Sequence, residues 1–173
     1  MSILKFIKAH GRIFLLIIVV LICAMIAAVM VRIDADGKTY TVRQACDVLP
    51  ESVAKQIGGK NLQKIAKSQT ESDDSVTSYC VFRNTDGSSV SVIVRSPKNE
   101  AGAQQNQQVF DSPPVANEVV RGYGDRAYWA QSLGQLSVLA HDNWYLLGSG
   151  SKQPAERTLE QAQVLARAIQ DRL

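Results

Sequence analysis

The sequence VTSYCVF at residues 76–82, followed by SVSVIVR at 89–95, decides the fold. Both runs alternate apolar and polar residues, which is the period of a β-strand with one buried face. The connection between them contains Asp86-Gly87, a pair that favours tight hairpin turns. In the first run Val76, Cys80 and Phe82 share one face, and in the second run Val90, Val92 and Val94 share one face. We therefore expect an antiparallel hairpin whose apolar face is covered by other elements.

Three further strands are predicted in the C-terminal half, at about 128–131, 136–140 and 144–147. Turn-forming residues separate them, at Ser132-Leu133-Gly134 and at Asp142-Asn143. Between the hairpin and these strands, residues 97–117 are polar and rich in glutamine. The first half of this segment has helical propensity, and Val109 with Phe110 is placed to dock a helix on the core. A disordered, low-complexity insert is the alternative.

The C-terminal segment predicts an amphipathic helix. Thr158 is placed to cap its start, and Gln161 completes a capping box. Apolar residues recur at steps of three and four, at Leu159, Ala162, Leu165, Ile169 and Leu173. We expect this apolar stripe to lie across the sheet.

A shorter helix is predicted upstream of the hairpin. Pro50 suits a first helical turn, Glu51 complements the positive end of the helix dipole, and Gly58-Gly59 ends the helix. Before this helix, residues 32–45 are mixed and polar, which indicates a stalk with a brief strand at 39–42. The expected fold class is α+β, with an antiparallel sheet flanked by N-terminal and C-terminal helices.

Residues 13–31 form an apolar run without a charge, a proline or a glycine. A helix of this length spans about 28 Å, close to the hydrocarbon thickness of a bilayer. The residues before it carry three basic side chains and no acid, which favours a cytoplasmic N-terminus. We expect a cytoplasmic tail at 1–12, a single-pass transmembrane anchor at 13–31, a stalk at 32–45 and an extracytoplasmic domain at 46–173. A signal peptide cleaved near Ala28 is the alternative.

The charge balance argues against a nucleic-acid partner. The chain has 173 residues, with 19 Lys and Arg against 16 Asp and Glu. Lys5, Lys8 and Arg12 in the N-terminal tail account for the whole excess, so the outer part is electrically balanced. This outer part contains no basic run interleaved with aromatic residues, a pattern that is typical of nucleic-acid-binding proteins. The part of the chain beyond the apolar run is long enough to form one domain with its own hydrophobic core.

Cys46 and Cys80 are the two cysteines outside the apolar run, while Cys23 lies within it. If the domain is extracytoplasmic, an oxidising compartment allows Cys46 and Cys80 to form a disulfide. Two reduced, buried thiols are the alternative, and they would accompany the opposite topology. No C-x-x-C spacing occurs, so we predict no zinc site.

Two features bear on catalysis. Ser52-Val53-Ala54-Lys55 matches the S-x-x-K pattern of penicillin-recognising enzymes, but the companion S-D-N and K-T-G motifs are missing. His141 is the only histidine beyond the N-terminal tail, and it precedes a predicted turn. Acidic residues that could offer oxygens to calcium lie in a loop without calcium-site glycines, at Glu71, Asp73 and Asp74. We therefore predict no catalytic residue, no metal site and no cofactor.

The stretch Gly122-Tyr123-Gly124-Asp125-Arg126 concentrates candidate binding residues. Two glycines allow a sharp bend, and Asp125 beside Arg126 can hold the bend by hydrogen bonds. Aromatic residues gather in the predicted strands that follow, and Tyr and Trp are favoured at interface centres. The candidate interaction residues are Tyr123, Asp125, Arg126, Trp129 and Trp144. The alternative is that these aromatic residues only build the core.

Four motifs, in this order, resemble a family of small envelope domains of unknown function from high-GC Gram-positive bacteria. They are Ala45-Cys46-Asp47-Val48-Leu49-Pro50, Tyr79-Cys80-Val81-Phe82, Gly122-Tyr123-Gly124-Asp125-Arg126-Ala127-Tyr128-Trp129 and Thr158-Leu159-Glu160-Gln161-Ala162. The resemblance implies an α+β sandwich similar to the PsbP-like fold, a disulfide between Cys46 and Cys80, and residence outside the cytoplasmic membrane. It brings no catalytic residues. This chain lacks the lipidation cysteine of the lipoprotein members, and the predicted anchor helix takes that role.

The sequence thus predicts a non-catalytic, membrane-anchored extracytoplasmic domain that binds another component of the cell envelope, either a protein or a cell-wall component. An envelope hydrolase built around Ser52 and Lys55, or around His141, is one alternative. A carrier of an apolar ligand in the concavity of the sheet is another.

Overall fold

A computed structural model describes residues 38–113 and 115–173. Among these residues, no helix combines the length and the apolar character that crossing a bilayer requires. The anchor predicted at 13–31, the tail at 1–12 and the start of the stalk lie outside the described residues, so these assignments stay predictions.

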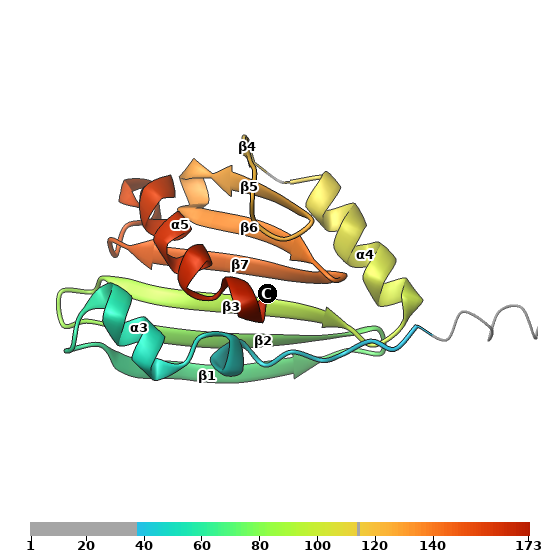
Figure 1. The fold of residues 1–173 in the computed structure, drawn as a ribbon, viewed down its shortest axis with the longest axis horizontal. Coiled ribbons are helices and arrows are strands. Elements are labelled where there is room, and N and C mark those ends of the chain that lie inside the picture. The colour runs from blue at the N-terminus through green and yellow to red at the C-terminus, as the bar shows by residue number, and fades with distance from the viewer. Residues whose placement is uncertain (1–37, 114) are drawn as a thin grey trace, which may run out of the picture. The chain divides into compact units, whose positions relative to one another are not determined.

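The described chain is α+β and is built on a seven-stranded antiparallel sheet (Figure 1). The strand order is β1-β2-β3-β7-β6-β5-β4. The strands are β1 (Gln63–Glu71), β2 (Ser75–Arg83), β3 (Ser89–Pro97), β4 (Glu118–Val120), β5 (Arg126–Ala130), β6 (Gln135–Ala140) and β7 (Asn143–Gly150). The predicted hairpin is confirmed as β2–β3, and the three predicted C-terminal strands are confirmed as β5, β6 and β7. Two strands, β1 and β4, were not predicted.

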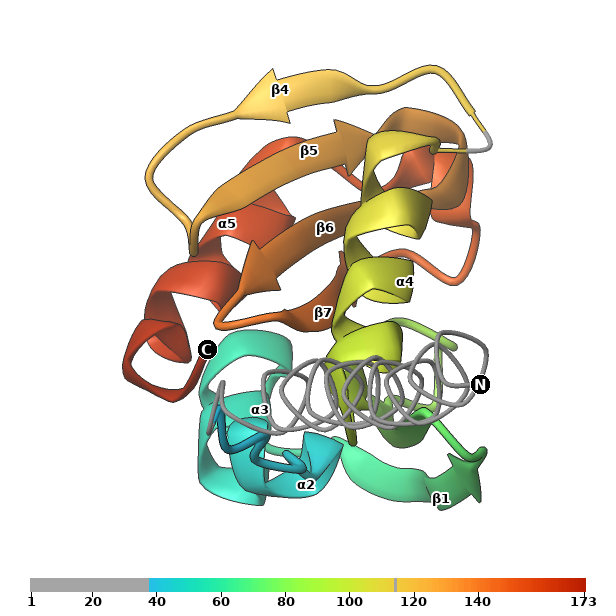
Figure 2. The ribbon, with the colours of Figure 1, turned by 90° about the vertical axis from the view of Figure 1, so that its right-hand side faces the viewer.

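Helices lie on both faces of this sheet (Figures 1 and 2). They are α2 (Ala45–Val48), α3 (Glu51–Gly58), α4 (Glu100–Asp111) and α5 (Leu159–Ala168), with 3₁₀ turns η1 (Gln131–Leu133), η2 (Pro154–Glu156) and η3 (Gln170–Arg172). We call the face covered by α2, α3 and α5 the inner face. It holds the main core, which includes Phe82, Val92, Val138, Leu147 and Leu165. On the opposite, outer face, α4 packs Phe110 against Tyr128, Ala130 and Leu139.

The C-terminal helix α5 is confirmed with its capping box. The Thr158 hydroxyl accepts from the backbone N–H of Gln161, and the Gln161 side chain accepts from the N–H of Thr158. Its predicted stripe is buried at Ala162, Leu165 and Ile169. The stripe therefore faces the inner side of the sheet, as expected.

The glutamine-rich segment is the ordered helix α4, so a disordered insert is the wrong alternative for its first half. Asn106 is fully buried within it. Its amide accepts a hydrogen bond from Arg95 Nη1 at 2.9 Å and donates one to the carbonyl of Asp142 at 2.8 Å. One buried amide thus joins α4 to strand β3 and to the β6–β7 turn.

The strand predicted at 39–42 is wrong, because residues 38–44 form no strand. Side-chain hydroxyls of the sheet hold the end of this segment instead. The N–H of Arg43 donates to Ser96 Oγ, and the N–H of Ala45 donates to Ser78 Oγ, both at 2.9 Å. These two backbone donors are each satisfied by a serine hydroxyl and not by the backbone of a neighbouring strand.

The predicted disulfide between Cys46 and Cys80 is present, with the two Cα atoms 5.0 Å apart. Cys46 lies in the four-residue helix α2, which precedes the predicted helix α3. Cys80 is fully buried on the inner face of β2. The bond therefore fixes the N-terminal helical segment to the covered side of the sheet.

Candidate functional site

A groove of about 500 Å³ lies beside the C-terminal end of α4, along β4 and the start of β5. We call it the α4–β4 groove. It is lined by side chains from α4, both strands and the loop between them, among them Phe110, Val119, Arg121, Asp125, Arg126 and Tyr128. The glycine-rich bend singled out in the sequence forms one of its walls.

The floor of the groove is aromatic. The rings of Phe110 and Tyr128 lie 4.8 Å apart between centroids, tilted by 56°. Both side chains are buried, with 6 % of each exposed. Val119, which pairs with Tyr128 in the β4–β5 register, is 75 % exposed. A large apolar side chain is therefore held in water beside a preformed apolar floor.

The rim of the groove carries charge of both signs. Arg126 Nη1 lies 2.5 Å from Asp111 Oδ1, and the guanidinium stands 5.1 Å from the centroid of the Phe110 ring. Both partners of this ion pair are about half exposed, so its contribution to stability is small. Its effect is to hold Arg126 over the aromatic floor. Arg121 is exposed and makes no hydrogen bond or ion pair to the described residues.

The bend between β4 and β5 depends on Gly124 and Asp125. Gly124 has a φ of +54°, and a Cβ atom there would lie 2.5 Å from the carbonyl oxygen of Leu139. The N–H of Asp125 donates to that same oxygen at 2.8 Å. The Asp125 carboxylate accepts from the N–H of His141 at 3.0 Å. The loop is therefore fixed to the β6–β7 turn, and Asp125 is used for structure.

The five predicted interaction residues do not form one surface. Asp125 and Arg126 line the groove. Tyr123 borders it, but its side chain is 6 % exposed and its hydroxyl accepts from Arg167 Nη1. Trp129 is 3 % exposed in the inner core, and its indole N–H donates to Gln131 Oε1. Trp144 lies partly buried on the outer face beside the α4 cluster.

The groove contains residues that sequence reasoning did not select. Val119 and Asp111 were not predicted, and Phe110 was expected only to dock α4. The sequence signal for Val119 was weak, because β4 has three residues and a strand this short shows no clear alternation.

The residues of the hydrolase alternative lie apart. Ser52 is exposed on α3, where Lys55 Nζ pairs with Glu51 Oε1 at 2.7 Å. That hydrogen bond from Lys55 lowers the pKa of the Glu51 carboxyl. His141 occupies the β6–β7 turn, at the other end of the strands from α3 (Figure 1). In the described part of the chain no hydrogen bond joins Ser52, Lys55 and His141, so they form no nucleophile–base pair.

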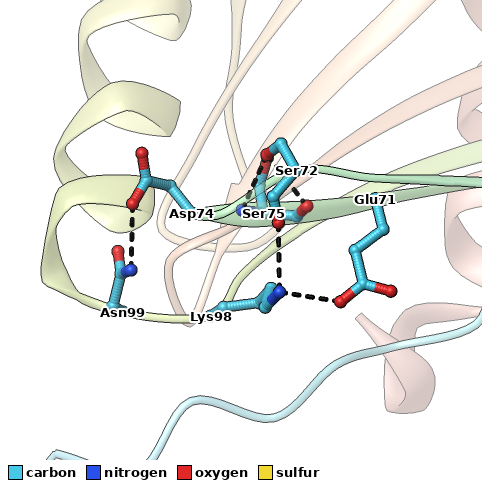
Figure 3. Close-up of polar contacts among 6 residues, drawn as sticks. All are labelled: Glu71, Ser72, Asp74, Ser75, Lys98 and Asn99. Carbon is cyan, nitrogen blue, oxygen red and sulfur yellow. Dashed lines mark hydrogen bonds and ion pairs between the residues drawn. The ribbon is translucent and has the colours of Figure 1, made fainter.

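The loop between β1 and β2, which contains the acidic residues considered for calcium, contacts the residues that precede α4 (Figure 3). Lys98 Nζ lies 2.7 Å from Glu71 Oε1 and donates to the carbonyl of Ser72 at 3.0 Å. Asn99 Nδ2 donates to Asp74 Oδ1 at 2.9 Å. These contacts hold the β1–β2 turn against the start of α4. Within residues 38–113 and 115–173, no group of three or more His, Cys, Asp or Glu side chains is placed to hold a metal ion.

Comparisons with protein-family models, with curated proteins and with solved structures gave no significant match.

Proposed function

We propose that this chain is a non-catalytic, membrane-anchored binding domain of the cell envelope that takes its partner in the α4–β4 groove. The observation that carries the proposal is the exposed Val119 beside the buried Phe110 and Tyr128 rings. Exposed apolar side chains next to a hollow are typical of binding surfaces, whereas scattered ones are ordinary.

The occupant we propose is an extended segment of another envelope protein that carries a large apolar side chain. Strand β4 is last in the strand order, so its outer edge has no strand partner among the described residues. An added strand can use the backbone groups of such an edge, while a neighbouring pocket selects its side chain. The Phe110–Tyr128 floor supplies that pocket.

The proposed location follows from the predicted anchor. A helix at 13–31 with a cytoplasmic N-terminus would place the described domain outside the membrane. The Cys46–Cys80 bond supports this proposal, because disulfides persist in oxidising compartments. We also propose that the domain belongs to the envelope family with a PsbP-like fold that its motifs resemble.

The groove volume favours a second candidate, a carrier of a small apolar ligand. Ligand pockets commonly measure about 300–1,000 Å³, and this groove falls within that range. The carrier and the protein-binding function predict different occupants of the same groove, so one set of variants separates them.

The test compares Val119→Asp with Ile65→Asp in full-length, tagged protein purified from cells under mild conditions. Ile65 is the matched control, since it is a 48 % exposed apolar residue on the opposite edge strand β1. Loss of a central anchor of about 2 kcal/mol weakens binding about 30-fold. We expect Val119→Asp to lose the co-purified partner and Ile65→Asp to keep it, as measured by quantitative mass spectrometry.

Equal retention in both variants would contradict binding in the groove. Equal loss of the partner in both variants would show that a charge at any exposed position disrupts capture. That result would also contradict binding in the groove. Loss of a co-purified lipid-soluble molecule, with no protein that depends on Val119, would favour the carrier.

A further inference from the structure

Arg157 is a partly buried cation without a carboxylate partner among the described residues. Its Nε donates to the carbonyl of Ser151 at 2.8 Å, and its Nη2 donates to Ser89 Oγ at 3.0 Å. Both acceptors are neutral. Cationic side chains withdrawn from water are ordinarily paired with an acid, because burying an unpaired charge is costly. The side chain of Arg157 is therefore a partly buried cation whose hydrogen bonds, among the described residues, go only to neutral oxygens.

Two glycines make the seat for this side chain on the sheet. A Cβ atom on Gly134 would lie 2.2 Å from the carbonyl oxygen of Pro154. A Cβ atom on Gly148 would lie 2.9 Å from Arg157 Nη1. Because both positions lack a side chain, the segment around η2 can lie directly on the residue before β6 and on strand β7. The guanidinium is thereby brought onto the sheet beside Ser89.

A second arginine stands beside the first. Arg83 pairs with Ser89 in the β2–β3 register, so its side chain projects from the same face as the serine that binds Arg157. Arg83 is exposed and makes no hydrogen bond or ion pair to the described residues. Burial, and then the positive charge of Arg83, lower the pKa of the Arg157 guanidinium. Two cations thus lie together on one face.

The acids closest in sequence do not neutralise this pair. Asp86 Oδ1 accepts from the N–H and the hydroxyl of Ser88, at 2.8 and 2.7 Å. Glu156 Oε2 accepts from Ser151 Oγ at 2.6 Å. Neither carboxylate pairs with Arg83 or Arg157. Within the described chain, neither Arg83 nor Arg157 forms an ion pair.

We propose that Arg83 and Arg157 form a binding site for an oxyanion, either a carboxylate or a phosphate group. Arginine presents a planar fork of N–H donors that matches both groups. Nη1 of Arg157 donates no hydrogen bond to the described residues and is not shut off from solvent, so it is available to such a ligand. This site shares no residue with the α4–β4 groove, and the proposal goes beyond the binding function proposed there.

The test measures the melting temperature of the full-length protein in a neutral detergent while inorganic phosphate or acetate replaces chloride at constant ionic strength. Arg83→Gln is the test variant, because Arg83 is exposed and its side chain makes no hydrogen bond or ion pair to the described residues. Lys67→Gln is the matched control. Lys67 is an exposed cation on strand β1, and it lies on the face of the sheet opposite to Arg83. Salting effects of phosphate on stability are shared by all variants.

A saturable rise in melting temperature is expected in the native protein and in Lys67→Gln, with one anion or with both, and its loss is expected in Arg83→Gln. In chloride alone, Arg83→Gln should melt at the native temperature or above it, since it removes like-charge repulsion. No saturable rise, an equal rise in Arg83→Gln, or a clearly lower melting temperature of Arg83→Gln in chloride would overturn the proposal. Val119→Asp should keep the anion response, so failure here and failure of the groove are told apart.

Discussion

The hydroxyl of Tyr145 lies in the inner core without a hydrogen-bond partner in the described structure. Arg43 contributes a second unpaired atom, its buried Nε. A buried hydroxyl without a partner costs about 1–3 kcal/mol of desolvation, whereas a phenyl ring of the same shape carries no such cost. The Tyr145 hydroxyl therefore lowers the free energy of unfolding relative to a phenyl ring at the same position.

We predict that Tyr145→Phe keeps the fold and leaves the free energy of unfolding unchanged, or raises it by up to about 1–2 kcal/mol. Burial raises the pKa of Tyr145. The native protein should therefore keep its stability below the ordinary tyrosine pKa of about 10 and lose part of it as the pH rises beyond that value, a loss that Tyr145→Phe should not show. Urea unfolding at pH 8 and above pH 10 measures both effects. A loss of more than about 1 kcal/mol at pH 8 would mean that the hydroxyl has a partner.

At the scale of elements, α4 is positioned by a contact that admits no side chain. A Cβ atom on Gly102 would lie 2.0 Å from the carbonyl oxygen of Asp74, in the β1–β2 turn. That oxygen also accepts from the N–H of Lys98 at 2.8 Å. The first turn of α4 can therefore reach the sheet only because residue 102 is a glycine.

We predict that Gly102→Ala destabilises the protein, although alanine gains about 1 kcal/mol in helix propensity. The clash with a backbone oxygen forces α4 to shift, and overpacking of this kind costs about 1–3 kcal/mol. Gln104→Ala, at an exposed position in the same helix, should be neutral or slightly stabilising. The denaturant midpoints of the two variants measure these changes in stability. If Gly102→Ala were the more stable one, the close approach of α4 would be wrong.

The elements that could be predicted from the sequence are those in which buried side chains recur with the period of a strand or of a helix. The β2–β3 hairpin could be found because Val90, Val92 and Val94 are buried on one face, and α5 because its stripe and capping box coincide. Strand β1 has no such signal, since all of it is exposed except the partly buried Ala66. Its pairing with β2 is made by backbone hydrogen bonds, which the side-chain pattern does not show.

The candidate site was predicted only in part, for a related reason. The bend at Asp125 and Arg126 is local, and its glycines mark it in the sequence. Phe110 and Val119 meet Arg126 only because α4 crosses the outer face, a long-range placement that local patterns cannot supply. Trp129 is core because the alternation of β5 turns it inward, opposite to Tyr128.

At the scale of the whole molecule, the disulfide joins the N-terminal segment to the sheet across 34 positions of sequence. On the chain-entropy model a closed loop of this length contributes about 3–4 kcal/mol. That is a large share of the stability of a small domain. We predict that reduction, or the double substitution Cys46→Ala with Cys80→Ala, lowers the free energy of unfolding by about this amount.

Denaturant unfolding with and without reductant measures this contribution, and alkylation of the denatured, unreduced protein counts the free thiols. Reductant should leave the double variant unaffected, which serves as the control. Two alkylatable thiols at Cys46 and Cys80 in protein taken directly from cells would contradict the proposed oxidising location.

The binding proposal depends on what lies against the α4–β4 groove in the living cell. A photo-crosslinking amino acid in place of Val119, in the full-length protein, reports its neighbour, and the same residue in place of Ile65 is the control on the other edge of the sheet. We expect one defined covalent adduct with an envelope protein from position 119 and none of that adduct from position 65. The same adducts from both positions, or no adduct from position 119 of a folded domain, would contradict a partner in the groove.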